Sequence, residues 1–403
     1  MRLTTERTAI RPAASGPTAR PTVALVAHNV HEHGGMERAC AELVRRGSAT
    51  YSFVVISSEL ASELRDLVVW ERILVPQRPF ALKFLTFAVR AGLRLRGSSV
   101  DLVHTVGAIV PNRVDIAAVH FCHAGFRQRT GSLVLPGQTL LRRGNTAFAR
   151  FLALIAERWS YRPGRLKTFA AVSIGVANEL RRDYPDIPVC MAPNGIDVDR
   201  FRPDADVRRE LRSEQGVAPT DLVVLFLGGD WDRKGLGIAI EGIAEASAAA
   251  RRQLNLWVVG RGDERRFRAI AERCGIADHV SFFGVRSDPE RFFQASDVFV
   301  LPTLYETFSL AAFEAAASRL PVLAPAVSGI DELIGQNEAG IVVERTSKSV
   351  GEAIARLAVD ADLRARMGSV GRLRASRYTW QESVEAILAA YGDLLGSQRR
   401  VTA

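Results

Sequence analysis

The chain alternates short apolar runs with longer amphipathic segments, and this alternation occurs twice. It is typical of βαβ units, in which helices cover a parallel sheet. In the first half, predicted strands at 22–27 and 53–56 flank a predicted helix at 35–46. In the second half, a strand at 222–227 precedes a helix at 234–249. We therefore expect an α/β fold with two Rossmann-like, doubly wound domains that face each other across a cleft.

Proline, asparagine and glycine gather in residues 193–203, between the two repeats of the pattern. These residue types favour turns, so the segment suits a hinge between domains. The first twenty residues contain no apolar core, which predicts a disordered leader rather than a secretory signal. The predicted organisation is a leader at 1–20, an N-terminal Rossmann-like domain at 21–195, a C-terminal one at 196–378, and a helix at 379–397 that packs back on the first domain.

With 403 residues, of which 47% are hydrophobic and 24% charged, the chain has the composition of a folded soluble protein. No window reaches the roughly 18 uncharged apolar residues that a membrane-spanning helix needs. The four cysteines, Cys40, Cys122, Cys190 and Cys274, are far apart and form no C-x-x-C pair. This spacing argues against a disulfide framework or a zinc ribbon, and it predicts a reducing, cytoplasmic compartment.

Charge is divided unevenly along the chain. Residues 1–195 hold 26 cations and 14 anions, a net +12, whereas residues 196–403 hold 27 and 30, a net −3. Only four of the 53 cations are lysines, and this arginine excess is most simply codon bias. Because no aromatic residues are interleaved with it, we expect no nucleic-acid partner. The basic first half favours an anionic membrane surface or an acidic acceptor.

Residues 80–96 place three phenylalanines beside four cations. This is the pattern of a helix that lies in a membrane interface. A core helix between two strands would have the same pattern, so both interpretations stay open. The net charge of the first half slightly favours the membrane.

Two glutamates eight residues apart, Glu306 and Glu314, flank a predicted loop-to-helix junction. Free backbone N–H groups at a helix N-terminus, here near residues 308–310, bind anions. Glu306 can accept hydrogen bonds from a neutral polyol, and Glu314 can hold a second diol further along the helix. The segment can therefore hold a sugar, a diphosphate and a ribose in order, although two glutamates at this spacing also occur by chance.

A second motif, residues 225–236, ends a strand at Gly228 and Gly229 and then presents Arg233 and Lys234 at a helix start. Two adjacent cations after a strand suit a diphosphate, although a solvated helix start would look similar. A chain with only four lysines places one of them here, which favours the functional interpretation.

The first half offers further groups for the same cleft. Gly34 and Gly35 follow the first strand and allow close backbone approach, although the pair is not the G-x-G-x-x-G of dinucleotide binding. His120 and His123 follow a later strand, where each could face the cleft or be a structural histidine. A metal site is a weaker alternative, because no carboxylate spacing supports it. It would use His28, His31, His33, His120 and His123.

Together these motifs resemble the retaining glycosyltransferases of family four, which have the two-domain GT-B fold. The resemblance extends over about residues 22–395, and its motif style is closest to that of lipopolysaccharide-core hexosyltransferases. Several ordered motifs in register make it specific. They are Gly34-Gly35 with Glu37, Asn194-Gly-Ile-Asp197 before Phe201, Arg233-Lys234-Gly235, Gly260-Arg-Gly262, Phe283-Gly284, the two glutamates, Pro321-Val322 and the helix at Trp380.

The resemblance implies a role for each motif. Arg233 and Lys234 would neutralise the diphosphate of a nucleotide-sugar donor, and Glu306 would hold the donor sugar. His123, or else His120, would reach that sugar from the acceptor-side first domain, which completes the predicted catalytic set. The predicted donor-binding set is Gly34, Gly35, Gly228, Gly229, Gly260, Gly284, Val285, Arg286, Thr307, Phe308, Ser309, Leu310 and the ribose-binding Glu314.

The chain departs from the family pattern at two places. Gly229 stands where many members have arginine, so Arg233 must supply the guanidinium. Thr307 and Ser309 replace both glycines of the usual E-G-F-G, which puts the backbone conformation near the phosphates in question.

The expected activity is transfer of a hexose, by preference from a UDP-hexose, to a glycan or lipid-linked acceptor of a bacterial cell envelope. Such a reaction belongs to polysaccharide or lipopolysaccharide biosynthesis. The resemblance implies no cofactor and no metal, with the nucleotide sugar as co-substrate, and a cytoplasmic protein that is peripheral on the inner face of the plasma membrane. Two alternatives stay open: a nucleotide-sugar 2-epimerase, and a non-catalytic nucleotide-sugar-binding protein.

Overall fold

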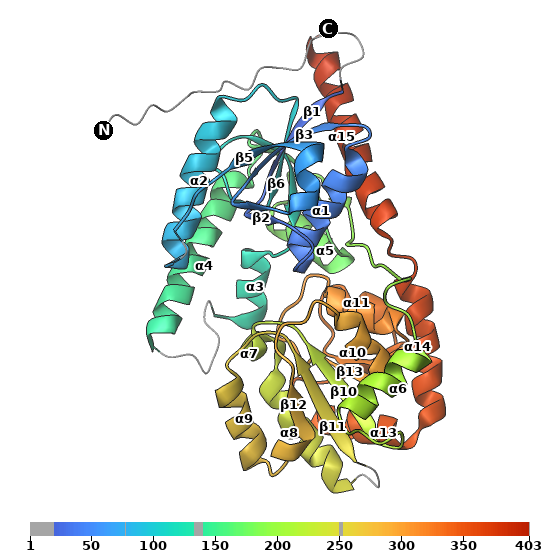
Figure 1. Ribbon diagram of the computed structural model, residues 1–403. Coiled ribbons are helices and arrows are strands. Elements are labelled where there is room, and N and C mark those ends of the chain that lie inside the picture. The colour runs from blue at the N-terminus through green and yellow to red at the C-terminus, as the bar shows by residue number, and fades with distance from the viewer. Residues whose placement is uncertain (1–19, 77, 133–139, 250–252, 403) are drawn as a thin grey trace, which may run out of the picture.

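The computed structural model describes residues 20–402 apart from residue 77, residues 133–139 and residues 250–252. The predicted leader at 1–20 therefore lies outside the described residues, except for Arg20. Two α/β lobes are stacked on each other, and the last helix runs alongside the N-terminal lobe (Figure 1). Each lobe is built on its own parallel sheet, so the predicted two-domain α/β fold is confirmed.

In the N-terminal lobe, neighbouring strands of a seven-stranded sheet are all parallel. Residues 23–26 and 53–56 of this sheet are continuous buried apolar runs, as expected where a sheet is covered on both faces. A separate two-stranded sheet pairs β2 (Asn29–Val30) with β4 (Glu59–Leu60). The order across the large sheet is β5 (Val68–Arg72), β3 (Ser52–Ser57), β1 (Thr22–Val26), β6 (Leu102–Val106), β7 (Val114–Val119), β8 (Leu166–Ala171) and β9 (Val189–Met191).

Helices connect these strands, and two of them, α2 (Phe80–Arg96) and α4 (Leu140–Ser160), pack side by side along one side of the lobe (Figure 1). Within the described part of the chain, no helix is both long enough and apolar enough to cross a membrane. The helical elements of this lobe are α1 (Gly35–Gly47), the 3-10 turn η1 (Ser62–Leu67), α2 (Phe80–Arg96), α3 (His123–Thr130), α4 (Leu140–Ser160) and α5 (Ile174–Asp183).

The C-terminal lobe repeats the plan with a six-stranded parallel sheet. Its order is β12 (Val280–Phe282), β11 (Leu254–Val259), β10 (Leu222–Leu227), β13 (Val298–Val300), β14 (Val322–Ala324) and β15 (Gly340–Val342). The helical elements are α6 (Ala205–Glu214), α7 (Trp231–Lys234), α8 (Leu236–Ala249), α9 (Glu264–Arg273), the 3-10 turn η2 (Ala277–His279), α10 (Pro289–Ala295), α11 (Leu310–Ala317), α12 (Ile330–Ile334), α13 (Ser347–Val359) and α14 (Ala361–Ala375).

The last helix, α15 (Trp380–Thr402), packs against α1 of the N-terminal lobe. Its Val384 and Tyr391 are buried in the same apolar cluster as Phe53 of β3. The Tyr391 hydroxyl also lies 2.5 Å from Nδ1 of the buried His104. The end of the chain therefore joins the two lobes, because α15 follows one lobe in sequence and packs on the other.

The structure differs from the sequence-based expectation at Gly235, where the predicted helix at 234–249 is interrupted. Gly235 has φ 82°, and a Cβ added to it would lie 2.2 Å from the carbonyl oxygen of Pro302, so only glycine fits there. As a result, Arg233 and Lys234 lie on the single-turn helix α7 and not at the start of α8. The sequence pattern also did not predict β5, a partly exposed edge strand that lacks a buried apolar run.

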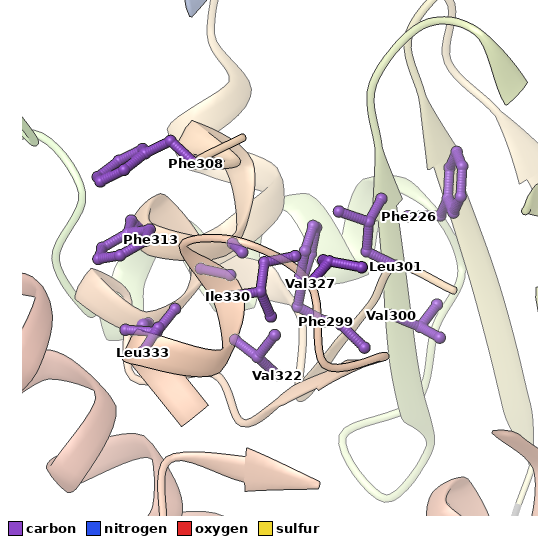
Figure 2. Packing of buried hydrophobic residues seen from close by; sticks show 14 of the residues in the cluster. Phe226, Phe299, Val300, Leu301, Phe308, Phe313, Val322, Val327, Ile330 and Leu333 are labelled. Atoms are coloured by element: carbon purple, nitrogen blue, oxygen red, sulfur yellow. The ribbon is translucent and has the colours of Figure 1, made fainter. Parts of the chain in front are cut away.

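The apolar core of the C-terminal lobe supports the N-terminal end of α11. Figure 2 shows Phe308 and Phe313 beside each other, on the same side of the cluster as Leu333. The two aromatic rings are stacked, with centroids 4.2 Å apart and 9° between their planes. Because Phe308 precedes α11 and Phe313 lies within it, this stack holds the preceding loop against the helix.

Candidate functional site

A cleft of about 1260 Å³ lies between the two lobes. Its walls include the carboxyl ends of β10 and β11 on one side and the start of α1 on the other. Ligands of open α/β sheets bind at this edge of the strands. The predicted residues that line the cleft are Gly34, Gly35, His120, Gly228, Gly229, Lys234, Gly260, Val285, Arg286, Glu306, Thr307, Phe308, Ser309, Leu310 and Glu314.

Three predicted site residues lie outside the wall of this cleft. Arg233 lies behind it and donates a hydrogen bond to Glu306. The carbonyl oxygen of Gly284 accepts a hydrogen bond from the backbone N–H of Gly260 at 2.7 Å. His123 lines a second cavity inside the N-terminal lobe.

A buried charge cluster joins the two strongest sequence motifs. Oε1 of Glu306 accepts hydrogen bonds from Nζ of Lys234 and from Nη1 of Arg233, both at 3.0 Å. The hydroxyl of Thr303 donates to the same oxygen at 3.3 Å. Nε of Arg233 also donates to Asp230 at 3.0 Å. Glu306 therefore holds both cations in place, in addition to any contact that it makes with a ligand.

The ionisation of this cluster follows from its ion pairs. Burial by itself would raise the pKa of Glu306, but Lys234 and Arg233 outweigh it and hold that pKa below its usual value. Burial would likewise lower the pKa of Arg233, but Glu306 and Asp230 raise it. The formal charges of these four residues sum to zero. A diphosphate here therefore needs positive potential from a further source.

The N-terminus of α11 provides such a source. Ser309 directly precedes this helix with φ 68° and ψ 76°, a left-handed conformation that favours glycine. Serine thus adopts the backbone conformation that a glycine would take at this position of the motif. The first N–H groups of a helix have no partner within it and bind anions. Phe308, Ser309 and Leu310 all line the cleft, so these groups are available to a phosphate.

Glu314 is contacted from the opposite lobe by Arg38, a residue that sequence reasoning did not assign to the site. Nη1 of Arg38 in α1 donates to Oε1 of Glu314 at 3.2 Å, and both side chains are largely buried. Burial raises the pKa of Glu314 to about 6, even though Arg38 lowers it. The feature of the sequence that could have identified Arg38 is its position shortly after the Gly34-Gly35 pair. Its partner Glu314, however, lies 276 residues away in the sequence.

The structure distinguishes the two candidate histidines by position. His120 lines the cleft, and its backbone carbonyl accepts a hydrogen bond from the hydroxyl of Thr307 at 2.7 Å, across the two lobes. Burial lowers the pKa of His120 to about 4, so the imidazole is neutral at pH 7. His123 is the first residue of α3, and its backbone N–H donates to Glu157 at 2.8 Å.

Tyr305 is a second residue that sequence reasoning missed. This buried side chain reaches from the C-terminal lobe into the N-terminal one, where its hydroxyl donates to Glu179 at 2.9 Å and lies 3.3 Å from the carbonyl oxygen of Cys122. Its ring packs edge-on against Phe121 and Phe126, with centroids 5.2 and 5.5 Å away. The one feature of the sequence that could have identified Tyr305 is its position next to Glu306. The contact fixes the spacing of the lobes beside the charge cluster.

Two glycines allow the loops after β10 and β11 to approach closely. Gly228 and Gly260 have φ 145° and 130°, and a Cβ added to Gly260 would lie 2.1 Å from the carbonyl oxygen of Gly228. A Cβ on Gly228 would lie 2.7 Å from Cδ of Lys234. Larger residues at these positions would displace the backbone or the Lys234 side chain.

Among the described residues, no group of three or more His, Cys, Asp or Glu side chains is placed to hold a metal ion. Of the histidines in the metal alternative, His28, His120 and His123 line the second cavity, and the ring centroids of His31 and His33 lie 5.8 Å apart. The ring of His28 packs 4.2 Å from that of Phe87, whereas Nε2 of His31 lies 3.9 Å from Glu59.

Two parallel-sheet lobes that enclose a cleft, with a helix N-terminus and a charge cluster on its wall, define a protein of the GT-B class. Solved structures share this architecture. WaaG, a glycosyltransferase involved in lipopolysaccharide biosynthesis, aligns with a TM-score of 0.77 and 21% identity over 91% of this chain and 98% of WaaG. Anabaena HepE in complex with UDP-glucose aligns with a TM-score of 0.70 and 16% identity over 92% of this chain and 99% of HepE.

Family models match both lobes. The model described as Glycosyltransferase Family 4 matches residues 33–200, and the one described as Glycosyl transferases group 1 matches residues 207–374. The chain belongs to this family of GT-B glycosyltransferases.

Two curated relatives align with this chain over part of their own length. A D-inositol 3-phosphate glycosyltransferase of Segniliparus rotundus is 28% identical over 300 residues, which cover 71% of this chain and 63% of the relative. A GDP-mannose-dependent α-(1-6)-phosphatidylinositol monomannoside mannosyltransferase of Mycobacterium tuberculosis is 35% identical over 196 residues, which cover 45% of this chain and 49% of the relative. The chain thus spans about half to two thirds of these relatives.

Proposed function

We propose that this chain is a retaining hexosyltransferase that needs no metal ion. It transfers a hexose from a nucleoside-diphosphate sugar, by preference UDP-hexose, to a glycan or lipid-linked acceptor of the bacterial cell envelope. The observation that carries this proposal is the meeting of Lys234, Glu306 and the N-terminus of α11 on one wall of the cleft. Family membership favours glycosyl transfer over epimerisation or binding alone.

Each group has a role that follows from its position. The ammonium of Lys234 and the N–H groups at Ser309 and Leu310 stabilise the diphosphate as it leaves. Glu306 accepts hydrogen bonds from the donor sugar while it orients Lys234. Glu314 accepts hydrogen bonds from the ribose. These interactions concentrate stabilisation where negative charge develops, so the metal-independent route has the groups that it needs.

The bond changes are those of a front-face displacement. The acceptor oxygen forms a bond to the anomeric carbon while the bond between that carbon and the diphosphate oxygen breaks. The departing phosphate oxygen takes the acceptor's proton, and attack on the same face retains the configuration. Glu306 is an unsuitable nucleophile because Lys234 and Arg233 both hold its oxygen.

Peripheral membrane binding, on the inner face of the plasma membrane, is the second part of the proposal. α2 and α4 together carry a row of exposed apolar side chains, which we call the α2–α4 face. Cations such as Arg90, Arg94 and Arg158 are exposed on the same helices, which suits an anionic lipid surface. The α2–α4 face consists of Leu82, Leu85, Val89, Leu93, Phe148, Phe151, Ile155 and Trp159.

A donor screen tests the enzymatic proposal. UDP-glucose, UDP-galactose and GDP-mannose are titrated into the full chain by calorimetry, and products are then analysed with and without an acceptor extract. We expect a UDP-hexose to bind and to release UDP mainly when the acceptor is present. Conversion of the donor to its 2-epimer without acceptor would overturn transfer, and binding of GDP-mannose alone would overturn the UDP preference.

A further inference from the structure

A second cavity, of about 400 Å³, lies inside the N-terminal lobe beside the cleft. It lies between α2, α4 and the carboxyl ends of β6 and β7. Its volume falls in the range of roughly 300–1,000 Å³ that small-molecule sites occupy. The wall is largely apolar and includes Phe84, Val106, Ile109, Ala149 and Ala153.

Three imidazoles lie in this wall, and those of His28 and His123 are uncharged, as is that of His120. Burial, with a smaller contribution from Lys83, lowers the pKa of His28 to about 4. Burial, with a smaller contribution from Arg150, does the same for His123. Nδ1 of His28 and Nδ1 of His123 are both buried without a hydrogen-bond partner among the described residues. These imidazoles offer neutral polar contacts within an otherwise apolar space.

The charged groups in the wall are engaged by the protein. Glu157 accepts hydrogen bonds from the backbone N–H groups of His123 and Ala124, at 2.8 and 3.1 Å. The guanidinium of Arg150 lies 4.2 Å from the ring centroid of Phe126. The cavity therefore suits an uncharged, mainly apolar ligand group, unlike the cleft with its phosphate-binding groups.

The cavity and the cleft share part of their walls. Met36, His120 and Phe121 line both of them. A molecule seated in the cavity can therefore present one end to the cleft at His120, the residue that faces the donor side from this lobe. On the side away from the cleft, the cavity is lined by Phe80, which is 52% exposed. This side of the cavity therefore opens toward the α2–α4 face.

We propose that this cavity holds the hydrocarbon chain of a lipid acceptor, whose hydroxyl group projects past His120 into the cleft. The inference rests on the proposed function, because it names the acceptor class of the same reaction. A hydrocarbon chain fits the path because the cavity is apolar along its wall and opens beside an exposed apolar face. The cavity contributes binding and orientation, and the bond changes are those given above.

A homologous series of probes tests this assignment. Methyl, hexyl, octyl and decyl β-D-glucosides are titrated into the full chain in the presence of UDP, below their micelle-forming concentrations. Each methylene buried in the cavity should strengthen binding about fourfold, since burial of one CH₂ contributes roughly 0.8 kcal/mol. Ala149→Phe and Ala153→Leu fill the cavity and should abolish the dependence on chain length. Ala147→Phe makes the same change on α4 at a residue that does not line the cavity, and it should preserve that dependence.

The affinity for UDP, measured alone, separates this inference from the proposed function. UDP should bind all of these variants as it binds the wild type, which also shows that they fold. If UDP binding persists, two results would overturn the lipid assignment. One is a wild-type affinity for the glucosides that does not depend on chain length. The other is the same dependence on chain length in both Ala149→Phe and Ala153→Leu as in the wild type. Loss of UDP binding by the wild-type chain would instead overturn the proposed function.

Discussion

Nζ of Lys234 and Oε1 of Glu306 lie 3.0 Å apart in the cleft, although 72 residues separate them in the sequence. Lys234 follows β10 and Glu306 follows β13, and these two strands are neighbours in the sheet. Strand pairing therefore brings the two motifs together at one edge. Glu306 fixes the ammonium at the wall of the cleft, where the proposed mechanism requires a cation beside the leaving diphosphate.

Lys234→Ala should lower turnover by about 10²-fold or more, because it removes the cation that stabilises the leaving group in the proposed mechanism. Arg233 would still pair with Glu306, so the fold should persist. Initial rates with saturating donor and acceptor measure this effect. The control is Lys348→Ala, which changes an exposed lysine on α13 and should leave the rate unchanged. Near-normal turnover by Lys234→Ala would contradict the assignment of this residue.

Glu314 predicts how donor binding depends on pH. Its pKa is raised to about 6, so the carboxyl becomes protonated as the pH falls through this value. A neutral carboxyl is a weaker acceptor for ribose hydroxyls, and the affinity for UDP-glucose should fall about tenfold between pH 7.5 and pH 5. UDP-glucose suits calorimetric titration because its diphosphate diester exchanges no proton in this range.

Glu314→Gln is the matched control for that pH dependence. The variant should bind UDP-glucose weakly at every pH and show a flat profile, because its amide does not titrate. Glu157, whose pKa burial raises to about 7, titrates in the neighbouring cavity and remains in the variant. A profile that keeps its full slope in Glu314→Gln would therefore assign the pH dependence to another group.

Ser309→Gly should raise the free energy of unfolding by about 0.5–1 kcal/mol. The left-handed conformation at φ 68° costs serine roughly 1–2 kcal/mol, and the greater freedom of glycine in the unfolded chain offsets part of that gain. The Ser309 hydroxyl has no hydrogen-bond partner among the described residues, so little is lost with it. Thermal unfolding measures the change. Ser309→Ala keeps the strained conformation, and equal stabilisation by both variants would contradict this explanation.

The α2–α4 face predicts membrane binding. The chain should sediment with phosphatidylglycerol vesicles at low salt, and Leu85→Ser with Val89→Ser should weaken this partitioning at least about tenfold. Added salt should also weaken it, because exposed cations contribute to the attraction. The control is Val359→Ser with Leu373→Ser, a pair of similarly exposed apolar residues in the other lobe. The absence of sedimentation at low salt would end this part of the proposal.

Local patterns predicted the regular elements well where burial is continuous. The strand β10 is a fully apolar run, β11 is interrupted only by Asn255, and the sequence located both strands closely. It missed β5 because an edge strand is half exposed and has no such run. It also extended a helix through Gly235, because helical periodicity carries no information about the Pro302 carbonyl that excludes a side chain there.

The sequence by itself determined the two-domain α/β plan and the chemical groups of the cleft, because periodicity, glycine placement and paired charges are local properties. Only the tertiary structure decided which groups meet. Arg38 reaches Glu314 and Tyr305 reaches Glu179 because two separately folded lobes close on each other. The tertiary structure also placed His120 at both the cleft and the neighbouring cavity but His123 at the cavity, although three residues separate them. Such pairings depend on how whole sheets and helices pack, and a one-dimensional pattern does not contain that information.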